Sequence, residues 1–166
     1  MSIEKGAWIM AKTKYGKYIT TNKVRPEGDP DWLSKIPRDP TGGRITTWLD
    51  GDVIPGAFYY ESFMAFKPTV EGSFNDPPHI HEDWDEIIGV YGTNPKDPDD
   101  LGGEVQLTIG DEVHSIKKSS AVFIPRGLQH GPLVIKKVST PIILVTTGAS
   151  RLYTQTLPKN WKTYLK

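Results

Sequence analysis

The sequence contains no cysteine, and this absence excludes several structures and chemistries at once. A disulfide-stabilised scaffold, a cysteine-ligated zinc site, an iron–sulfur cluster and a thiol nucleophile all require that side chain. Histidine is scarce as well, because the 166 residues include only four: His79, His81, His114 and His130. A metal site in this chain is therefore expected to use imidazole nitrogens and oxygen atoms.

The chain also lacks net charge and long apolar runs. Its 20 basic residues balance its 20 acidic residues, so no general attraction to nucleic acid or to an anionic membrane is expected. The longest apolar runs, such as residues 142–145, are far shorter than the roughly 18 residues that indicate a membrane span. The first 16 residues have no apolar stretch of the length that a signal peptide needs. These features predict a cytoplasmic protein with no nucleic-acid or membrane partner.

Helical patterns are scarce, and most of the chain consists of short strand-like segments separated by turn residues. Gly110 and Asp111 predict a two-residue hairpin turn, because glycine supplies the positive φ that such turns require. The pattern as a whole predicts an all-β protein, an antiparallel sandwich or barrel with little helix. The predicted strands are 44–49, 57–67, 85–91, 104–109, 112–116, 121–124 and 142–147.

The length suits a single domain over residues 1–166, with a barrel core at about 44–147, an extension at 1–43 and a tail at 148–166. Residues 28–40 and 93–103 are rich in proline and aspartate and are predicted to be surface loops. The tail is aromatic and can pack either on its own chain or on a partner subunit. One face of segment 57–67 is mostly apolar: Phe58, Tyr60, Ser62, Met64 and Phe66.

His79 and His81 are separated by one residue and are followed by an acidic stretch. In an extended strand, residues i and i+2 lie on the same face about 6.5 to 7 Å apart, so the two imidazoles can converge on one ion. A tight reversal after His81 would return the Glu86 carboxylate to the same point. Alternation places Glu86 on one face with Ile88 and Val90, where an unpaired buried charge is costly and a metal ion would compensate it.

A second histidine follows the predicted strand 121–124. Pro125 ends that strand, Gly127 permits a turn, and His130 re-enters extended structure beside the first pair. Three of the four histidines can then serve one site.

These two segments resemble the two motifs of the cupin superfamily, which are HxH with a glutamate after four further residues, and PxGxxH. The matching residues are His79, His81 and Glu86, and then Pro125, Gly127 and His130. The resemblance covers about residues 44–147. It implies a double-stranded β-helix, or jelly-roll, barrel that holds one divalent transition metal ion through His79, His81, Glu86 and His130. Iron, manganese, nickel, copper and zinc all accept such ligands.

Each candidate ligand has a second interpretation. The histidine pair can be two surface residues beside an acidic turn, and Glu82, Asp83 or Asp85 can supply the carboxylate in place of Glu86. His114 fits neither motif and is interpreted as an ordinary strand residue.

Three other residues are candidates for substrate binding. Tyr60 and Trp84 can line a pocket, although aromatic residues in a protein of this type are more often part of the core. Arg126, beside the second motif, can meet an anionic substrate or face water. No residue is assigned a catalytic role.

Three imidazoles and one carboxylate leave about two open positions on an octahedral ion, as in a catalytic metal site. We therefore expect a metal-dependent enzyme that acts on a small oxygen-bearing organic molecule, with dioxygenase chemistry preferred over isomerase, lyase or decarboxylase chemistry. The alternatives are a non-catalytic, metal-dependent small-molecule-binding or sensor protein and a barrel with a purely structural metal. Edge strands and the aromatic tail also predict a homodimer.

Overall fold

A computed structural model describes residues 13–23, 43–69 and 76–160 of the chain. These residues form eight strands and one short 3-10 helix, η1 (Gly16–Tyr18). Among the described residues no helix has the length and apolar character needed to cross a membrane. The strands are β1 (Gly43–Leu49), β2 (Tyr59–Ala65), β3 (Glu86–Gly92), β4 (Asp100–Ile109), β5 (Glu112–Lys118), β6 (Ser120–Ile124), β7 (His130–Val138) and β8 (Ile142–Gly148).

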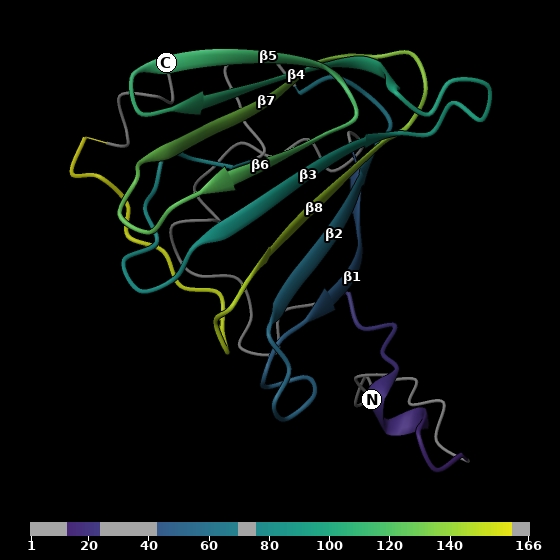
Figure 1. Cartoon of the computed structure of the whole chain (residues 1–166), viewed down its shortest axis with the longest axis vertical. Helices are drawn as coiled ribbons and strands as arrows, with labels where there is room; N and C mark the ends of the chain where they lie inside the picture. Colours follow the sequence, from purple (N-terminus) through teal and green to yellow (C-terminus); the bar gives the residue numbers. More distant parts are fainter. Residues whose placement is uncertain (1–12, 24–42, 70–75, 161–166) are drawn as a thin grey trace, which may run out of the picture.

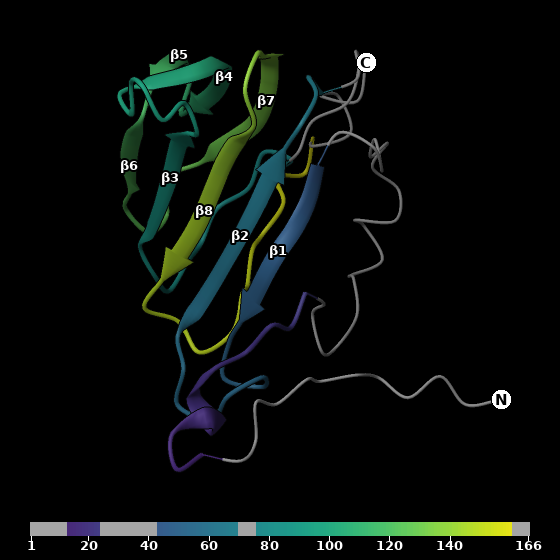
Figure 2. The same ribbon diagram turned by 90° about the vertical axis from the view of Figure 1, so that its right-hand side faces the viewer.

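The strands form two antiparallel sheets. One sheet has five strands in the order β1-β2-β8-β3-β6, and the other has three in the order β5-β4-β7 (Figure 1). Seen from the side, the three-stranded sheet lies at one end of the molecule, beyond the ends of β3 and β8 (Figure 2). The prediction of an all-β protein with little helix is confirmed. Residues 28–40, predicted as a surface loop, fall outside the described residues.

The core lies between the two sheets. Apolar side chains from both sheets form its main cluster, which includes Ile88 and Val90 of β3, Leu107 of β4 and Ile135 of β7. Removal of these side chains from water is the dominant favourable term for a fold of this kind. A second, aromatic cluster contains Trp48, Tyr59 and Trp84. It adjoins the site described below.

Three features differ from the sequence-based prediction. The first is β7, which was not predicted as a strand although His130 was expected to be extended. Gly131 and Pro132 lie inside β7 and are typical of turns. The fold tolerates Pro132 because the pairing of β7 with β4 shifts register between Leu107 and Ile109, and proline is accepted at such irregularities of a sheet.

The second difference is the start of β4, because residues 100–103 belong to this strand and not to the predicted loop. Leu101 is fully buried in the core. Gly102 has a φ of +67°, and a Cβ on Gly103 would lie 2.1 Å from the carbonyl oxygen of Lys137. These two glycines therefore allow an irregular strand to pass close to β7, and they do not mark a loop.

The third difference is the face of β2 that points inward. Tyr59 and Ala65 are buried and Phe63 packs on the core, whereas Phe58 and Phe66 are exposed. Both alternating sets of this strand are largely apolar, so hydrophobicity alone did not decide which set faces the core. The hairpin at Gly110 and Asp111 is confirmed, with a φ of +61° at Gly110 alone, as in a type II′ turn.

Candidate metal centre

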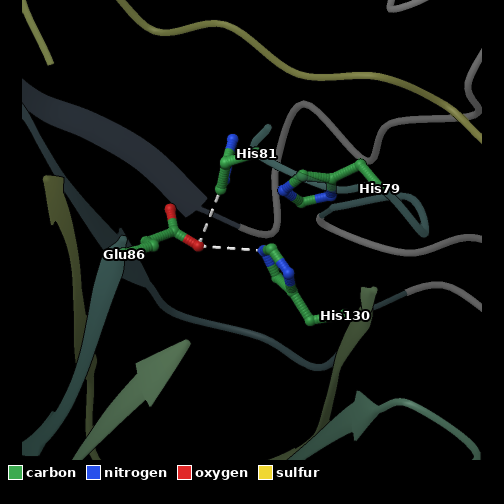
Figure 3. A group of neighbouring side chains, drawn as sticks. All are labelled: His79, His81, Glu86 and His130. Atoms are coloured by element: carbon green, nitrogen blue, oxygen red, sulfur yellow. Dashed lines mark ion pairs between the residues drawn. The ribbon is translucent and has the colours of Figure 1, made fainter. Parts of the chain in front are cut away.

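The structure brings together the four residues predicted as metal ligands. The ligand atoms of His79, His81, Glu86 and His130 all lie within 4.8 Å of one another, and each residue is at most 2% exposed. His79 and His81 come from the extended segment before β3, whereas Glu86 and His130 are the first residues of β3 and β7 (Figure 3). This group could hold one metal ion.

Backbone hydrogen bonds join the two motifs. His79 N donates to His130 O at 2.9 Å, and His130 N donates to His79 O at 3.0 Å, which makes an isolated antiparallel bridge. Gly127, with a φ of +77°, turns the chain after Pro125, and its N–H donates to His81 O at 2.7 Å. The glycine is needed here because other residues rarely adopt this φ. The second motif is thus placed directly on the first.

Each histidine ring is oriented by a backbone carbonyl. His79 Nδ1 donates to Pro77 O at 2.7 Å and His81 Nδ1 donates to Thr154 O at 2.7 Å. His130 Nδ1 donates to Leu128 O at 3.1 Å. Because a carbonyl oxygen can only accept, Nδ1 carries the proton in each ring, and the neutral imidazole keeps its Nε2 lone pair for a metal ion.

The atoms at the centre of the group lack ordinary partners. His81 Nε2, His130 Nε2 and Glu86 Oε2 are buried without a hydrogen-bond partner among the described residues. Glu86 Oε2 nevertheless lies 2.9 Å from His130 Nε2 and 3.4 Å from His81 Nε2 (Figure 3). With Nδ1 protonated, each neutral ring turns a lone pair toward a carboxylate oxygen, and such contacts are repulsive. A cation between these atoms, or a second proton on an imidazole, removes the repulsion.

The pKa values place most of these groups in the state that a metal requires. Burial raises the pKa of Glu86, but its contacts with His130 and His81 outweigh burial and lower that pKa to about 2. Burial, with a smaller contribution from His130, lowers the pKa of His79 to about 3. Burial also lowers the pKa of His130, but once Nε2 is protonated it can donate a hydrogen bond to the charged Glu86 carboxylate, and this raises the pKa of His130 above its ordinary value overall. A metal ion therefore competes with a proton for His130 Nε2.

Aromatic residues surround the histidines. The Trp84 ring stacks on the His81 ring with centroids 3.8 Å apart, and Trp84 Nε1 donates to Thr154 Oγ1 at 3.1 Å. The Tyr153 ring lies 4.8 Å from that of Tyr59, and the Tyr153 hydroxyl is 3.4 Å from His79 Nε2. Burial, and next the charge of Asp76, raise the pKa of Tyr153 well above 10, so its phenol keeps its proton.

Sequence reasoning missed three residues near the group. Asp76 Oδ2 is 3.6 Å from His79 Nε2, Tyr59 contacts Trp84, and Tyr153 comes from the predicted tail. None of them belongs to a motif with recognisable spacing. The sequence did not decide whether the tail packs on its own chain or on a partner subunit. In the described residues it packs on its own chain, where Thr156 forms an isolated β-bridge with Ile80.

Two predicted substrate contacts and His114 lie elsewhere. Tyr60 is on the face of β2 opposite to that of Tyr59, because neighbouring residues of a strand point to opposite faces. Arg126 is exposed and pairs with Asp85, its Nη2 lying 3.2 Å from Asp85 Oδ2. His114 is exposed and lies 3.4 Å from Glu112. Trp84 does adjoin the histidines.

The other carboxylates of the first motif do not take the place of Glu86. Asp85 accepts a hydrogen bond from the backbone N–H of Arg126 at 2.8 Å, and Glu82 accepts one from the Thr156 hydroxyl at 3.0 Å.

Both cupin motifs meet in one buried group inside a pair of antiparallel sheets. The chain has the cupin fold. This assignment follows from the topology of the sheets and from the convergence of the two motifs.

No family model and no curated protein sequence matches this chain. Its solved structural neighbours include an oxalate oxidase, with 22% identity and a TM-score of 0.49 over 78% of this chain. This chain spans 62% of the length of that oxidase. A polyketide cyclase from Streptomyces resistomycificus matches with 20% identity and a TM-score of 0.44, over 76% of this chain and 84% of the cyclase. A cupin-2 domain from Rhodospirillum rubrum matches with 9% identity and a TM-score of 0.46, over 73% and 68%.

Proposed function

We propose that this chain is a metal-dependent cupin enzyme that acts on a small oxygen-bearing organic molecule. The observation that carries the proposal is the convergence of three carbonyl-oriented histidines on a buried carboxylate oxygen. Histidines held in this way are typical of metal ligands, because the bond at Nδ1 fixes both the ring and its tautomer. The ligands would be His79, His81, Glu86 and His130.

A bound iron, manganese, nickel, copper or zinc ion would supply Lewis-acid or redox chemistry at this point. On a six-coordinate ion these four ligands would leave about two positions for a substrate oxygen and for water or dioxygen. A ligand set that filled every position would instead indicate a structural site.

The residues of the chain supply orientation and exclude water. The Trp84 ring covers one face of His81, and the Thr154 carbonyl fixes its Nδ1. Both contacts restrict the ring to one orientation, as a preorganised site requires. The near-complete burial of the four ligands limits access by bulk water, and electrostatic interactions with a reacting group are stronger in such a site.

We prefer dioxygenase chemistry, because two open positions can take dioxygen and a substrate oxygen together. The test is oxygen consumption by protein loaded anaerobically with iron(II), across a panel of diols, phenols and keto acids, with products followed by mass spectrometry. Oxygen uptake with an oxygenated product supports a dioxygenase. A product without oxygen uptake contradicts that preference and supports isomerase, lyase or decarboxylase chemistry. Saturable ligand binding without any product supports the non-catalytic binding or sensor function.

We also propose that the chain forms a homodimer. The support is an exposed apolar pair on the outer face of the larger sheet, where Ile87 of β3 lies directly opposite Phe123 of β6. Tyr91, further along β3, is exposed as well. Exposed apolar residues that gather on one sheet face are typical of protein interfaces, and β6 is an edge strand.

A further inference from the structure

The segment after β8 lies against the metal centre and is held there by its backbone. Ile80, between the two histidines of the first motif, donates its N–H to Thr156 O at 3.0 Å. Thr156 returns a hydrogen bond to Ile80 O at 2.9 Å, and His81 Nδ1 donates to Thr154 O. These bonds fix the position of residues 153–156 relative to the ligands.

Tyr153 presents its hydroxyl to this centre. The oxygen lies 3.4 Å from His79 Nε2, which is one of the four clustered ligand atoms. The Tyr153 ring packs edge-on against Trp84 with centroids 5.9 Å apart, and its ring is tilted against that of Tyr59 at 4.8 Å. Its hydroxyl is thus a hydrogen-bond donor held by packing at the edge of the coordination sphere.

Gln155 supplies a second donor beside the first. The Tyr153 hydroxyl donates to Gln155 Oε1, so the side-chain amide of Gln155 lies next to the phenol. Gln155 Nε2 is buried and has no hydrogen-bond partner among the described residues. A buried N–H without an acceptor is unfavourable, and a ligand oxygen placed here would remove that cost.

We propose that Tyr153 and Gln155 form a donor pair, in which the Tyr153 hydroxyl holds the Gln155 amide through its Oε1 and the amide N–H positions an oxygen of the metal-bound substrate. The inference rests on the proposed metal-dependent function and specifies the substrate class. The substrate carries an acceptor oxygen, such as a carbonyl, enolate or phenolate oxygen, beside the atom that binds the metal. Tyr153 and Gln155 are thus positioning residues supplied by the C-terminal segment, whereas His79, His81, Glu86 and His130 hold the metal.

The test uses azide as the probe, because azide occupies an open position of iron(III) and accepts hydrogen bonds. The full-length protein is loaded with iron(III), its iron content is measured, and azide is titrated while its charge-transfer band is recorded. The variants are Tyr153→Phe and Gln155→Leu. The matched control is Tyr59→Phe, which removes a phenol hydroxyl from the same aromatic cluster, where it lies 2.5 Å from Thr146 Oγ1.

Wild type and all three variants are expected to hold one iron per chain. Loss of one hydrogen bond should weaken azide binding about 3- to 10-fold in Tyr153→Phe and in Gln155→Leu, and shift the charge-transfer band to longer wavelength. Tyr59→Phe should stay within about twofold of wild type. A purely structural role would change iron content or thermal stability without moving the band.

Three results overturn the donor pair. If Tyr153→Phe holds its full iron content and its azide affinity and band position are unchanged, Tyr153 does not position the ligand, and the proposed metal site is unaffected. Loss of iron from Tyr153→Phe shows instead that the residue maintains the site itself. Wild-type protein that binds no iron or other transition metal contradicts the proposed function, and the donor pair with it.

Discussion

His81 Nδ1 donates a hydrogen bond to the carbonyl oxygen of Thr154, which lies 73 residues further along the chain, at 2.7 Å. The contact makes the C-terminal segment part of the metal centre, because it sets the orientation and the tautomer of one ligand. The segment is in turn held by the paired hydrogen bonds between Ile80 and Thr156.

Thr156→Pro should therefore weaken metal binding. Proline removes the N–H that Thr156 donates to Ile80 O, and the segment that carries the Thr154 carbonyl loses one of its two backbone anchors. Loss of an outer partner of a metal ligand typically lowers affinity by about 10- to 100-fold. A competitive zinc titration measures the change. Thr156→Ala is the control, because it keeps the backbone N–H and removes only the hydroxyl that bonds Glu82. Equal metal affinities in the two variants would show that the backbone pairing of Ile80 with Thr156 does not support His81.

Glu86→Gln should lower metal affinity by at least about tenfold, because an amide replaces the one carboxylate of the ligand set. The control is Asp85→Asn at the neighbouring position. Asp85 pairs with Arg126 outside the ligand group, so its loss should leave metal content unchanged. Elemental analysis of both purified proteins measures this. If Asp85→Asn lost its metal while Glu86→Gln retained it, Glu86 would not be the carboxylate ligand.

The stability that a bound metal ion adds to the protein should grow with rising pH, because the metal and a proton compete for His130 Nε2. In the metal-free protein, the raised pKa of His130 means that its protonated form, paired with Glu86, stabilises the fold below the ordinary pKa of 6.5. This contribution is lost as the pH rises through the raised pKa of His130. A metal ion needs the neutral ring, so metal-dependent stabilisation should instead grow with rising pH.

Thermal unfolding between pH 5.5 and 8.5 measures this added stability as the difference in Tm between protein loaded with one equivalent of zinc and chelator-treated protein. His79 stays neutral in both folded forms because its pKa is lowered to about 3, whereas the unfolded chain protonates it below about pH 6.5. His79 therefore lowers the stability of both forms equally as the pH falls, and it does not change the difference. A difference in Tm between the loaded and chelator-treated protein that does not change with pH would contradict competition between metal and proton.

The motif residues were predictable from sequence because their geometry is local. Spacing of two in extended chain brings His79 and His81 together, and strand alternation places Glu86 on the buried face of β3 with Ile88. The position of His130 followed from a strand that ends at Pro125 and a turn at Gly127, and the structure has both.

The rest of the site depends on contacts that no local pattern encodes. Tyr59 and not Tyr60 faces the interior, and both are aromatic, so the register of β2 was set by its partners β1 and β8. Tyr153 reaches His79 through a pairing of the C-terminal segment with Ile80, which is remote in sequence. Turn-forming residues inside β7 hid that strand in the same way, because Pro132 is accepted only where the register with β4 shifts, and the sequence does not show that shift.

The proposed homodimer predicts a particle of about twice 18.5 kDa in solution. Phe123→Asp should shift it toward the monomer, because a charge would be buried opposite Ile87 of the exposed apolar pair. Multi-angle light scattering after size exclusion measures the mass at micromolar concentration. Val113→Asp is the control, since Val113 is equally exposed but lies on β5 in the other sheet. A monomeric wild type would refute the dimer.

The proposed activity and the donor pair both require that one metal ion binds to the three imidazoles and the carboxylate. X-ray absorption spectroscopy on protein loaded with one equivalent of iron, manganese, nickel, copper or zinc tests it most directly. We predict three imidazole ligands at about 2.0 to 2.2 Å and at least one oxygen ligand, with the imidazole scattering reduced in His130→Ala. A shell made only of oxygen atoms, or a protein that retains none of the five metals, would contradict the account.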